Sequence, residues 1–246
     1  MNKFNKKYSE NGFLIEKNYF NKDDVNKITN EIQNLKKNVD LYYDKKGKLR
    51  RIERLYDKGE SLNLANSKIM DLLKKIFETS FTIFKDKFNA KPPGGEGFFA
   101  HYDGIFKFRN EKNELKKGWY EYGNKFVNVL IALDQFDETN GTIEIAKADE
   151  GNFDELFLNT KKNGTPDILP EIEKKLKFNP MNLNVGDVVI FNNTCPHRSK
   201  KNNSNSDRKS LYYTYTPLEL GSKYDEYFND KLKSKNTTSK SLSGDL

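Results

Sequence analysis

The sequence predicts an α+β protein with two N-terminal helices and a β-sandwich or barrel formed by the C-terminal two-thirds of the chain. Up to about residue 88, apolar residues recur at helical spacing, whereas from Phe98 onward they form short β-rich runs separated by turn signals. No internal repeat or linker divides the 246 residues. We therefore expect a single domain over residues 1–230, followed by a polar, basic and disordered tail over residues 231–246.

The two helices are predicted from apolar residues that repeat every three or four positions. The first is expected over residues 21–39, where Asn21 or Asp23 can cap the first turn. The second is expected from about Leu62 to Phe88 and should pack on a sheet.

Six later segments have the composition of strands. Turn signals lie between them at residues 138–142 (ETNGT) and 184–187 (NVGD). In chain order the segments are GFFAHYD, KFVNVLIALDQF, TIEIA, MNLN, DVVIF and RKSLYYTYTPL. Two helices followed by at least six strands predict the α+β class.

Composition narrows the kinds of function that the chain can have. No apolar run approaches the roughly 18 residues of a membrane span, and the N-terminal residues do not resemble a signal peptide, so a cytoplasmic protein without membrane partners is expected. Cys195 is the one cysteine, which excludes an internal disulfide and a cysteine-based zinc site and favours a small buried apolar role. A bound metal would need histidine and carboxylate ligands.

The net charge of +7 does not predict nucleic-acid binding, because most of it lies near the two ends. Residues 1–8 contribute +3 and residues 231–246 another +3, which leaves +1 for residues 9–230. A nucleic-acid-binding module would need a basic face within that central part.

The stretch FFAHYDGIF places a histidine and an aspartate where they can act together. On a strand, His101 and Asp103 project to the same face and Tyr102 to the other. His197, the only other histidine, directly follows the strand DVVIF. Two imidazoles and one carboxylate are the ligands of mononuclear non-haem iron centres. An isolated histidine is more often structural, however, and an H-x-D triplet also occurs by chance.

Arg208 adds a further part to this motif. It follows His197 by 11 residues and begins the last predicted strand. It can be a surface charge, or its planar guanidinium can hold the distal carboxylate of a dicarboxylate bound to the metal. With these motifs, the chain resembles the Fe(II)/2-oxoglutarate dioxygenases, and specifically the phytanoyl-CoA dioxygenase family. The resemblance covers roughly residues 10–230 and includes KPPGGEGFFAHYD, NVLIALDQFDETNGTIEI and VGDVVIFNNTCPHRSKKNNSNSDRKSLYYTY.

The resemblance implies a double-stranded β-helix core, a cupin-like jelly roll, with flanking N-terminal helices. It also implies that Fe(II) and 2-oxoglutarate are the cofactors and that O2 and a small molecule are the co-substrate and substrate. By this match the iron ligands and catalytic residues are His101, Asp103 and His197. Arg208 would bind the C5 carboxylate of 2-oxoglutarate with the assistance of Ser199, and Lys91 would reach either this cosubstrate or the substrate.

The same resemblance extends to the reaction. Relatives that halogenate lack the aspartate, so Asp103 implies hydroxylation. The motifs are most similar to those of bacterial enzymes that hydroxylate small organophosphonates such as 2-aminoethylphosphonate, which implies hydroxylation on the carbon beside phosphorus. Arg51, Arg54 and Lys107 are candidate anion contacts, and Tyr102, where the family often has Gln, is a candidate substrate contact.

Other features leave alternatives open. Trp119, Tyr120 and Tyr122 can line the entrance or hold an alkylammonium group, or they can belong to the core. The same chemistry on another small carboxylate, amine or acyl thioester is one alternative function. A non-catalytic, cupin-like metal-binding protein is another, and it would need the metal ligands but not Arg208. The oligomeric state is not predicted.

Overall fold

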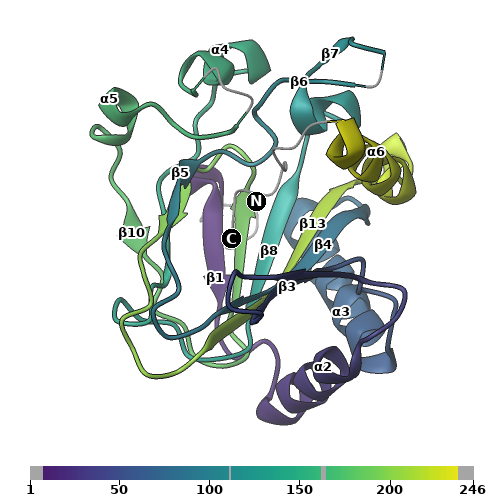
Figure 1. Ribbon diagram of the computed structural model, residues 1–246, viewed down its shortest axis with the longest axis vertical. Coiled ribbons are helices and arrows are strands. Elements are labelled where there is room, and N and C mark those ends of the chain that lie inside the picture. Colours follow the sequence, from purple (N-terminus) through teal and green to yellow (C-terminus); the bar gives the residue numbers. More distant parts are fainter. Residues whose placement is uncertain (1–7, 111, 162–164, 238–246) are drawn as a thin grey trace.

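Two antiparallel sheets form the centre of the protein (Figure 1). The structure is a computed structural model and describes residues 8–110, 112–161 and 165–237. Within these residues the larger sheet has seven strands in the order β1-β11-β8-β13-β4-β3-β2. In chain order these are β1 (Phe13–Glu16), β2 (Asp40–Tyr43), β3 (Leu49–Glu53), β4 (Phe81–Lys91), β8 (Val127–Ala132), β11 (Val188–Asn192) and β13 (Arg208–Pro217).

A smaller sheet packs against the larger one and completes a jelly-roll core. In the described residues it has the order β10-β9-β12-β5, formed by β5 (Phe98–His101), β9 (Ile143–Ile145), β10 (Asn179–Pro180) and β12 (His197–Ser199). Side chains from both sheets meet in one buried cluster that includes Leu130, Ile145 and Phe191. Cys195 belongs to this cluster and is fully buried, which confirms its expected apolar role.

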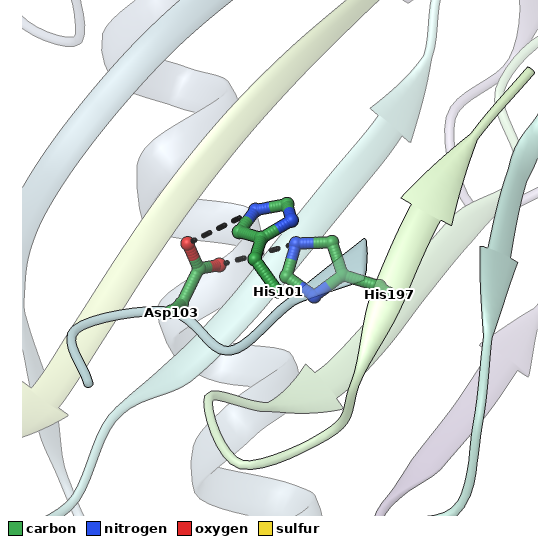
Figure 2. Close-up of side chains that lie close together, drawn as sticks. All are labelled: His101, Asp103 and His197. Carbon is green, nitrogen blue, oxygen red and sulfur yellow. Dashed lines mark ion pairs between the residues drawn. The ribbon is translucent and has the colours of Figure 1, made fainter. Parts of the chain in front are cut away.

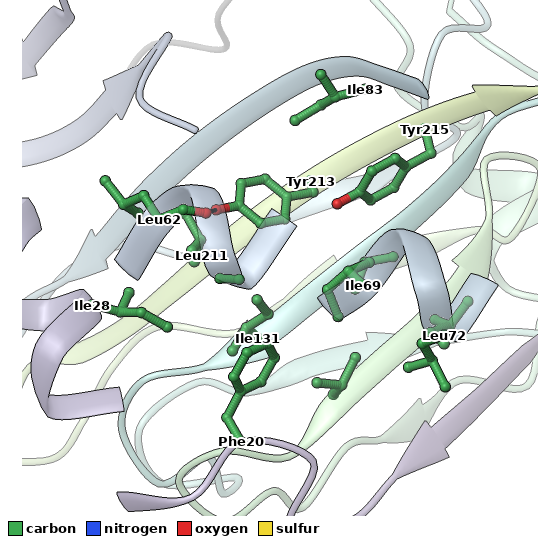
Figure 3. Packing of buried hydrophobic residues seen from close by; sticks show 14 of the residues in the cluster. Phe20, Ile28, Leu62, Ile69, Leu72, Ile83, Ile131, Leu211, Tyr213 and Tyr215 are labelled. Carbon is green, nitrogen blue, oxygen red and sulfur yellow. Dashed lines mark hydrogen bonds between the residues drawn. The ribbon is translucent and has the colours of Figure 1, made fainter. Parts of the chain in front are cut away.

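Two helices, α2 (Lys22–Asn34) and α3 (Glu60–Phe77), cover the outer face of the larger sheet. Asn21 caps the start of α2 through a capping box. Its side chain accepts a hydrogen bond from the backbone N–H of Asp24, and the Asp24 side chain accepts one from the backbone N–H of Asn21. Figure 3 shows Ile28 of α2 and Ile69 of α3 together with Leu211 of β13 in the largest buried cluster. The α+β prediction is confirmed.

Both helices are shorter than predicted. The first ends at Asn34 rather than residue 39, because Leu35 has an extended backbone. The second ends at Phe77 rather than Phe88, because Glu78 takes a left-handed conformation with φ of 56°. The segment Phe81–Lys91 is strand β4, which pairs along its whole length with β13, from Pro217 opposite Phe81 to Arg208 opposite Lys91.

The prediction of a disordered tail over residues 231–246 is wrong for its first seven residues. Residues 231–237 continue helix α6 (Tyr224–Thr237), and residues 238–246 lie outside the described part of the chain. Tyr224 and Phe228 bury one face of the helix in the core, and Lys231, one turn further on, forms a buried ion pair with Glu53 of β3.

The remaining elements are short and lie in the connections. In chain order they are β6 (Phe108–Arg109), β7 (Leu115–Lys116), η1 (Gly118–Glu121), α4 (Phe153–Leu158), α5 (Pro170–Glu173) and η2 (Leu218–Leu220). None of the helices in the described residues is long and apolar enough to span a membrane.

Candidate metal centre and adjoining cavity

The two histidines are brought together by pairing within the smaller sheet. His101 is the last residue of β5, His197 is the first residue of β12, and these residues lie opposite each other in the antiparallel pair. Asp103 follows two residues after His101, where its backbone N–H donates to Asn193 O at 3.0 Å. The amide of Asn128 on β8 donates to Asp103 Oδ2 at 2.9 Å and so orients the carboxylate.

Three donor atoms converge on one point (Figure 2). The Nδ1 atoms of His101 and His197 are 2.9 and 3.0 Å from the backbone carbonyls of Phe99 and Cys195, which leaves both Nε2 atoms to face the carboxylate. His101 Nε2 lies 3.9 Å from Asp103 Oδ1, and His197 Nε2 lies 3.6 Å from Oδ2. One ligand atom from each residue lies within 4.8 Å of the other two.

The protonation states of the triad suit a divalent cation. Burial, together with the neighbouring His197, lowers the pKa of His101 to about 3, and burial also lowers the pKa of His197. Burial alone would raise the pKa of Asp103, but His197 and the nearby Lys87 lower it to about 2. Two neutral imidazoles and one carboxylate therefore offer free lone pairs, and this donor set fits a first-row metal ion such as iron.

A buried guanidinium lies in the same cavity as the triad. Arg208 begins β13 opposite Lys91, and its Nη1 donates to Gly141 O at 2.9 Å while its Nε has no hydrogen-bond partner. In the part of the chain that the structure describes, no carboxylate forms an ion pair with Arg208. Its guanidinium carbon instead lies 4.6 Å from the ring centroid of Phe136. A buried cation of this kind is suited to an anionic ligand.

Lys91 and Ser199 lie beside Arg208 in the cavity. The ammonium of Lys91 donates to Ser199 Oγ at 2.7 Å and to the backbone oxygen of Lys200 at 2.6 Å. Burial and then the charge of Arg208 lower the pKa of Lys91 to about 7. Because Ser199 Oγ accepts a hydrogen bond from Lys91, the hydroxyl proton of Ser199 can be donated to a ligand.

The triad and Arg208 line one cavity of about 860 Å³ between the two sheets. The cations that line its opposite wall include Arg51 on β3 and Lys85 and Lys87 on β4. Sequence reasoning had missed both lysines because it placed them on a helix. Lys85 and Lys87 alternate with Asp86, Phe84 and Phe88, which are buried on the other face of the strand, and this alternation was the available signal.

Three candidate substrate contacts do not line the cavity. The guanidinium of Arg54 is held by Asp40 through two hydrogen bonds of 2.9 Å, because the chain turns away from the sheet after β3. The Lys107 ammonium lies 4.2 Å from the ring centroid of Phe157, outside the cavity.

Tyr102 is the third candidate outside the cavity. Its side chain is fully buried on the face opposite His101, where the hydroxyl donates to Asp149. Trp119 and Tyr122 do line the cavity, whereas Tyr120 packs on Phe153 with ring centroids 5.0 Å apart.

A jelly-roll core with this donor set defines the class of mononuclear non-haem metal proteins. Within this class the chain belongs to the phytanoyl-CoA dioxygenase (PhyH) family, whose model matches residues 8–210. This match confirms the family inferred from the motifs.

Two curated relatives act on phosphonates according to their names. A 2-aminoethylphosphonate dioxygenase of an uncultured bacterium (HF130_AEPn_1) is 29% identical over 177 residues, which cover 72% of this chain and 61% of the relative. A methylphosphonate hydroxylase of Gimesia maris is 29% identical over 175 residues, which cover 70% and 59%. The chain thus spans about three-fifths of the length of these relatives.

Solved structures share the fold at low sequence identity. The α-ketoglutarate-dependent carbocyclase SnoK from nogalamycin biosynthesis has a TM-score of 0.67 and 14% identity, with 89% of this chain and 85% of that chain covered. EctD from S. alaskensis, solved with 2-oxoglutarate and 5-hydroxyectoine, has a TM-score of 0.65 and 13% identity, with 88% and 76% covered. These similarities confirm the predicted jelly-roll fold.

Proposed function

We propose that the protein is an Fe(II)/2-oxoglutarate-dependent dioxygenase in which His101, Asp103 and His197 hold the iron. The observation that carries this proposal is that three metal-donor atoms converge in the same cavity as the buried guanidinium of Arg208. Among the described residues, this guanidinium has no carboxylate partner. Bound iron would activate O2 for hydroxylation of a C–H bond, with 2-oxoglutarate as the co-reductant. The names of the family and of both curated relatives agree with this chemistry.

The polypeptide's contribution is to bind and orient the 2-oxoglutarate. Arg208 would hold the distal carboxylate with its Nε and Nη2 donors, since Nη1 is already used by Gly141 O. Ser199 would add a third donor to that carboxylate. Lys91 fixes the Ser199 hydroxyl and adds positive charge beside the anion.

For the substrate we propose a small organophosphonate that is hydroxylated on the carbon beside phosphorus. Lys87 and Arg51 supply positive charge to the wall that faces the triad. Within the described residues, Lys87 has no ion pair; its ammonium lies 4.8 Å from the ring centroid of Tyr212. The Arg51 side chain is held by Asn89 Oδ1 at 3.2 Å and lies 3.8 Å from Glu53. These two cations suit a phosphonate dianion and would hold the adjacent carbon at a fixed distance from the iron.

A substrate screen with Fe(II) and 2-oxoglutarate tests both parts of the proposal. Succinate formed above the uncoupled background measures coupling, and 31P NMR identifies an α-hydroxyphosphonate product. Lys87→Met should weaken phosphonate-stimulated turnover and leave the slow uncoupled decarboxylation largely unchanged. Arg54→Lys is the matched control, because Arg54 is a neighbouring cation held by Asp40 outside the cavity.

The alternatives give different results in the same screen. Stimulation by a carboxylate, amine or acyl thioester, but by no phosphonate, would retain the oxygenase and reject the substrate. Tight metal binding without any 2-oxoglutarate turnover would favour the non-catalytic metal-binding protein.

A further inference from the structure

One corner of the cavity is built from aromatic rings and is occupied by a lysine of the protein itself. We define the aromatic corner as Trp119, Tyr122 and Tyr227, all of which line the cavity. The ammonium of Lys85 lies 4.8 Å from the ring centroid of Trp119 and 5.8 Å from that of Tyr227. In residues 8–110, 112–161 and 165–237, Lys85 forms no ion pair and no hydrogen bond, so these rings are its principal partners. Faces of Trp and Tyr are the surfaces that bind substrate ammonium groups in other proteins.

The aromatic corner lies directly beside the metal centre. Gly104 follows the metal-ligand candidate Asp103, and the backbone N–H of Trp119 donates to Gly104 O at 3.2 Å. A Cβ atom on Gly104 would lie 2.8 Å from atoms of the Trp119 side chain, and the φ of Gly104 is +80°. Only glycine permits this close approach, which fixes the indole against the backbone next to the triad. The aromatic corner, with Lys85 on it, therefore lies within the cavity immediately next to the candidate metal ligands.

The carboxylates around the cavity do not compensate for this positive charge. Apart from Asp103, each carboxylate lining the described part of the cavity already has a partner of its own. These pairs are Asp44 with Arg50 at 3.7 Å, Glu96 with Lys201 at 2.9 Å, Asp167 with Lys161 at 3.2 Å and Asp230 with the Tyr122 hydroxyl at 2.8 Å. A substrate ammonium would have to compete with a cation for Asp44, Glu96 or Asp167. Asp230 accepts from the neutral Tyr122 hydroxyl, so any ammonium that it bound would also lie beside the charge of Lys85.

We infer that Lys85 makes the enzyme select phosphonates whose remaining part carries no positive charge. The inference rests on the proposed function and deepens it, because it chooses alkylphosphonates over aminoalkylphosphonates. Lys85 takes the place that a substrate ammonium would occupy on the aromatic corner. With Lys87 and Arg51 it adds a third cation, which attracts the dianion and repels a cationic head group.

The test compares two substrates that differ in one group. In n-propylphosphonate a methyl group stands where 2-aminoethylphosphonate has its ammonium, and the two chains are equal in length. For the wild-type protein, kcat/KM for propylphosphonate should exceed that for 2-aminoethylphosphonate by roughly tenfold or more, the effect of one like-charge contact in a partly buried site. Lys85→Met keeps most of the side-chain volume and should bring the ratio close to one. Lys107→Met, which removes a ring-stacked lysine outside the cavity, should leave the ratio unchanged.

Each result has a distinct meaning. Equal use of both substrates by the wild type, or a preference for the amine, would overturn the inference while the phosphonate oxygenase stands. An unchanged ratio in Lys85→Met would also overturn it, because the selectivity would then have another origin. If neither phosphonate stimulates succinate formation, the proposed substrate class fails and the inference fails with it. The wild-type comparison remains decisive if the Lys85 variant does not fold.

Discussion

Replacing Arg208 by lysine tests the proposed 2-oxoglutarate site while keeping its positive charge. The guanidinium uses Nη1 to bind Gly141 O at 2.9 Å, and its Nε lacks a partner. Nε and Nη2 therefore form the edge that can bind a carboxylate through two hydrogen bonds. A lysine ammonium has no such planar edge and would also lie beside the Lys91 ammonium.

The expected loss follows from this geometry. One charge-assisted hydrogen bond contributes about 1.5–3 kcal/mol. Its removal should raise the KM for 2-oxoglutarate roughly 10- to 100-fold. Metal binding should change little, because Arg208 contacts none of the three candidate ligands.

Steady-state kinetics with 2-oxoglutarate as the varied substrate measures this effect, and metal content is determined on the same preparation by mass spectrometry. Arg54→Lys is the control, since it makes the same exchange at an arginine paired with Asp40 outside the cavity. A KM within twofold of wild type for Arg208→Lys would show that the cosubstrate is bound elsewhere. A parallel loss of bound metal would instead indicate general damage to the site.

Three further predictions concern the metal, the pH dependence and the C-terminal helix. Asn128→Ala removes the hydrogen bond to Asp103 and should weaken Mn(II) or Fe(II) binding roughly 10- to 100-fold, measured by calorimetry. Burial lowers the pKa of Lys87 to about 7, so this lysine is charged below pH 7 and loses its charge above it. The KM for phosphonate should therefore rise between pH 7 and 9 at saturating 2-oxoglutarate, and Lys87→Arg should flatten the rise. Lys231→Met leaves Glu53 buried without its main ion-pair partner and should lower the free energy of unfolding in urea by about 3–5 kcal/mol, whereas adding Glu53→Gln should restore part of it.

The metal half of the site could be predicted because short-range rules determine it. Strand alternation predicts that His101 and Asp103 face the same way, and the chain has only one other histidine to complete the set. The structure corrects the reason: β5 ends at His101, and Asp103 in the following loop is directed to the histidines by hydrogen bonds with Asn193 and Asn128. Arg208 could be predicted in the same way, from its position at the start of a strand 11 residues after His197.

The boundaries of the second helix could not be predicted, because the segment FTIFKDKFNAK fits two periods. Phe77, Phe81 and Phe84 continue the helical spacing, while Phe81, Ile83 and the lysines also fit a strand. The segment forms a strand because pairing with β13 provides hydrogen-bond partners for its backbone along the whole length. That partner lies more than 100 residues away in the sequence, and local patterns do not report it.

The candidate substrate residues were affected by the same error. On a helix, Lys85 and Lys87 would point in different directions and would give no reason to expect an anion site. On β4 they share the face that lines the cavity, and Arg51 joins them because it lies opposite Asn89 in the β3–β4 pair. The conspicuous cations Arg54 and Lys107 are held outside by Asp40 and Phe157.

The candidate metal ligands and the lysines of the cavity wall come from different sheets. The three metal-ligand candidates lie on β5, β12 and the loop after β5, whereas Lys85 and Lys87 lie on β4 in the other sheet. A change at Lys85 or Lys87 therefore alters the charge on the substrate side of the cavity without replacing a residue of the triad or its hydrogen-bond partners. Lys87 helps to lower the pKa of Asp103 more than Lys85 does, so Lys85 is the position on β4 at which the charge of this wall can change with less effect on the triad.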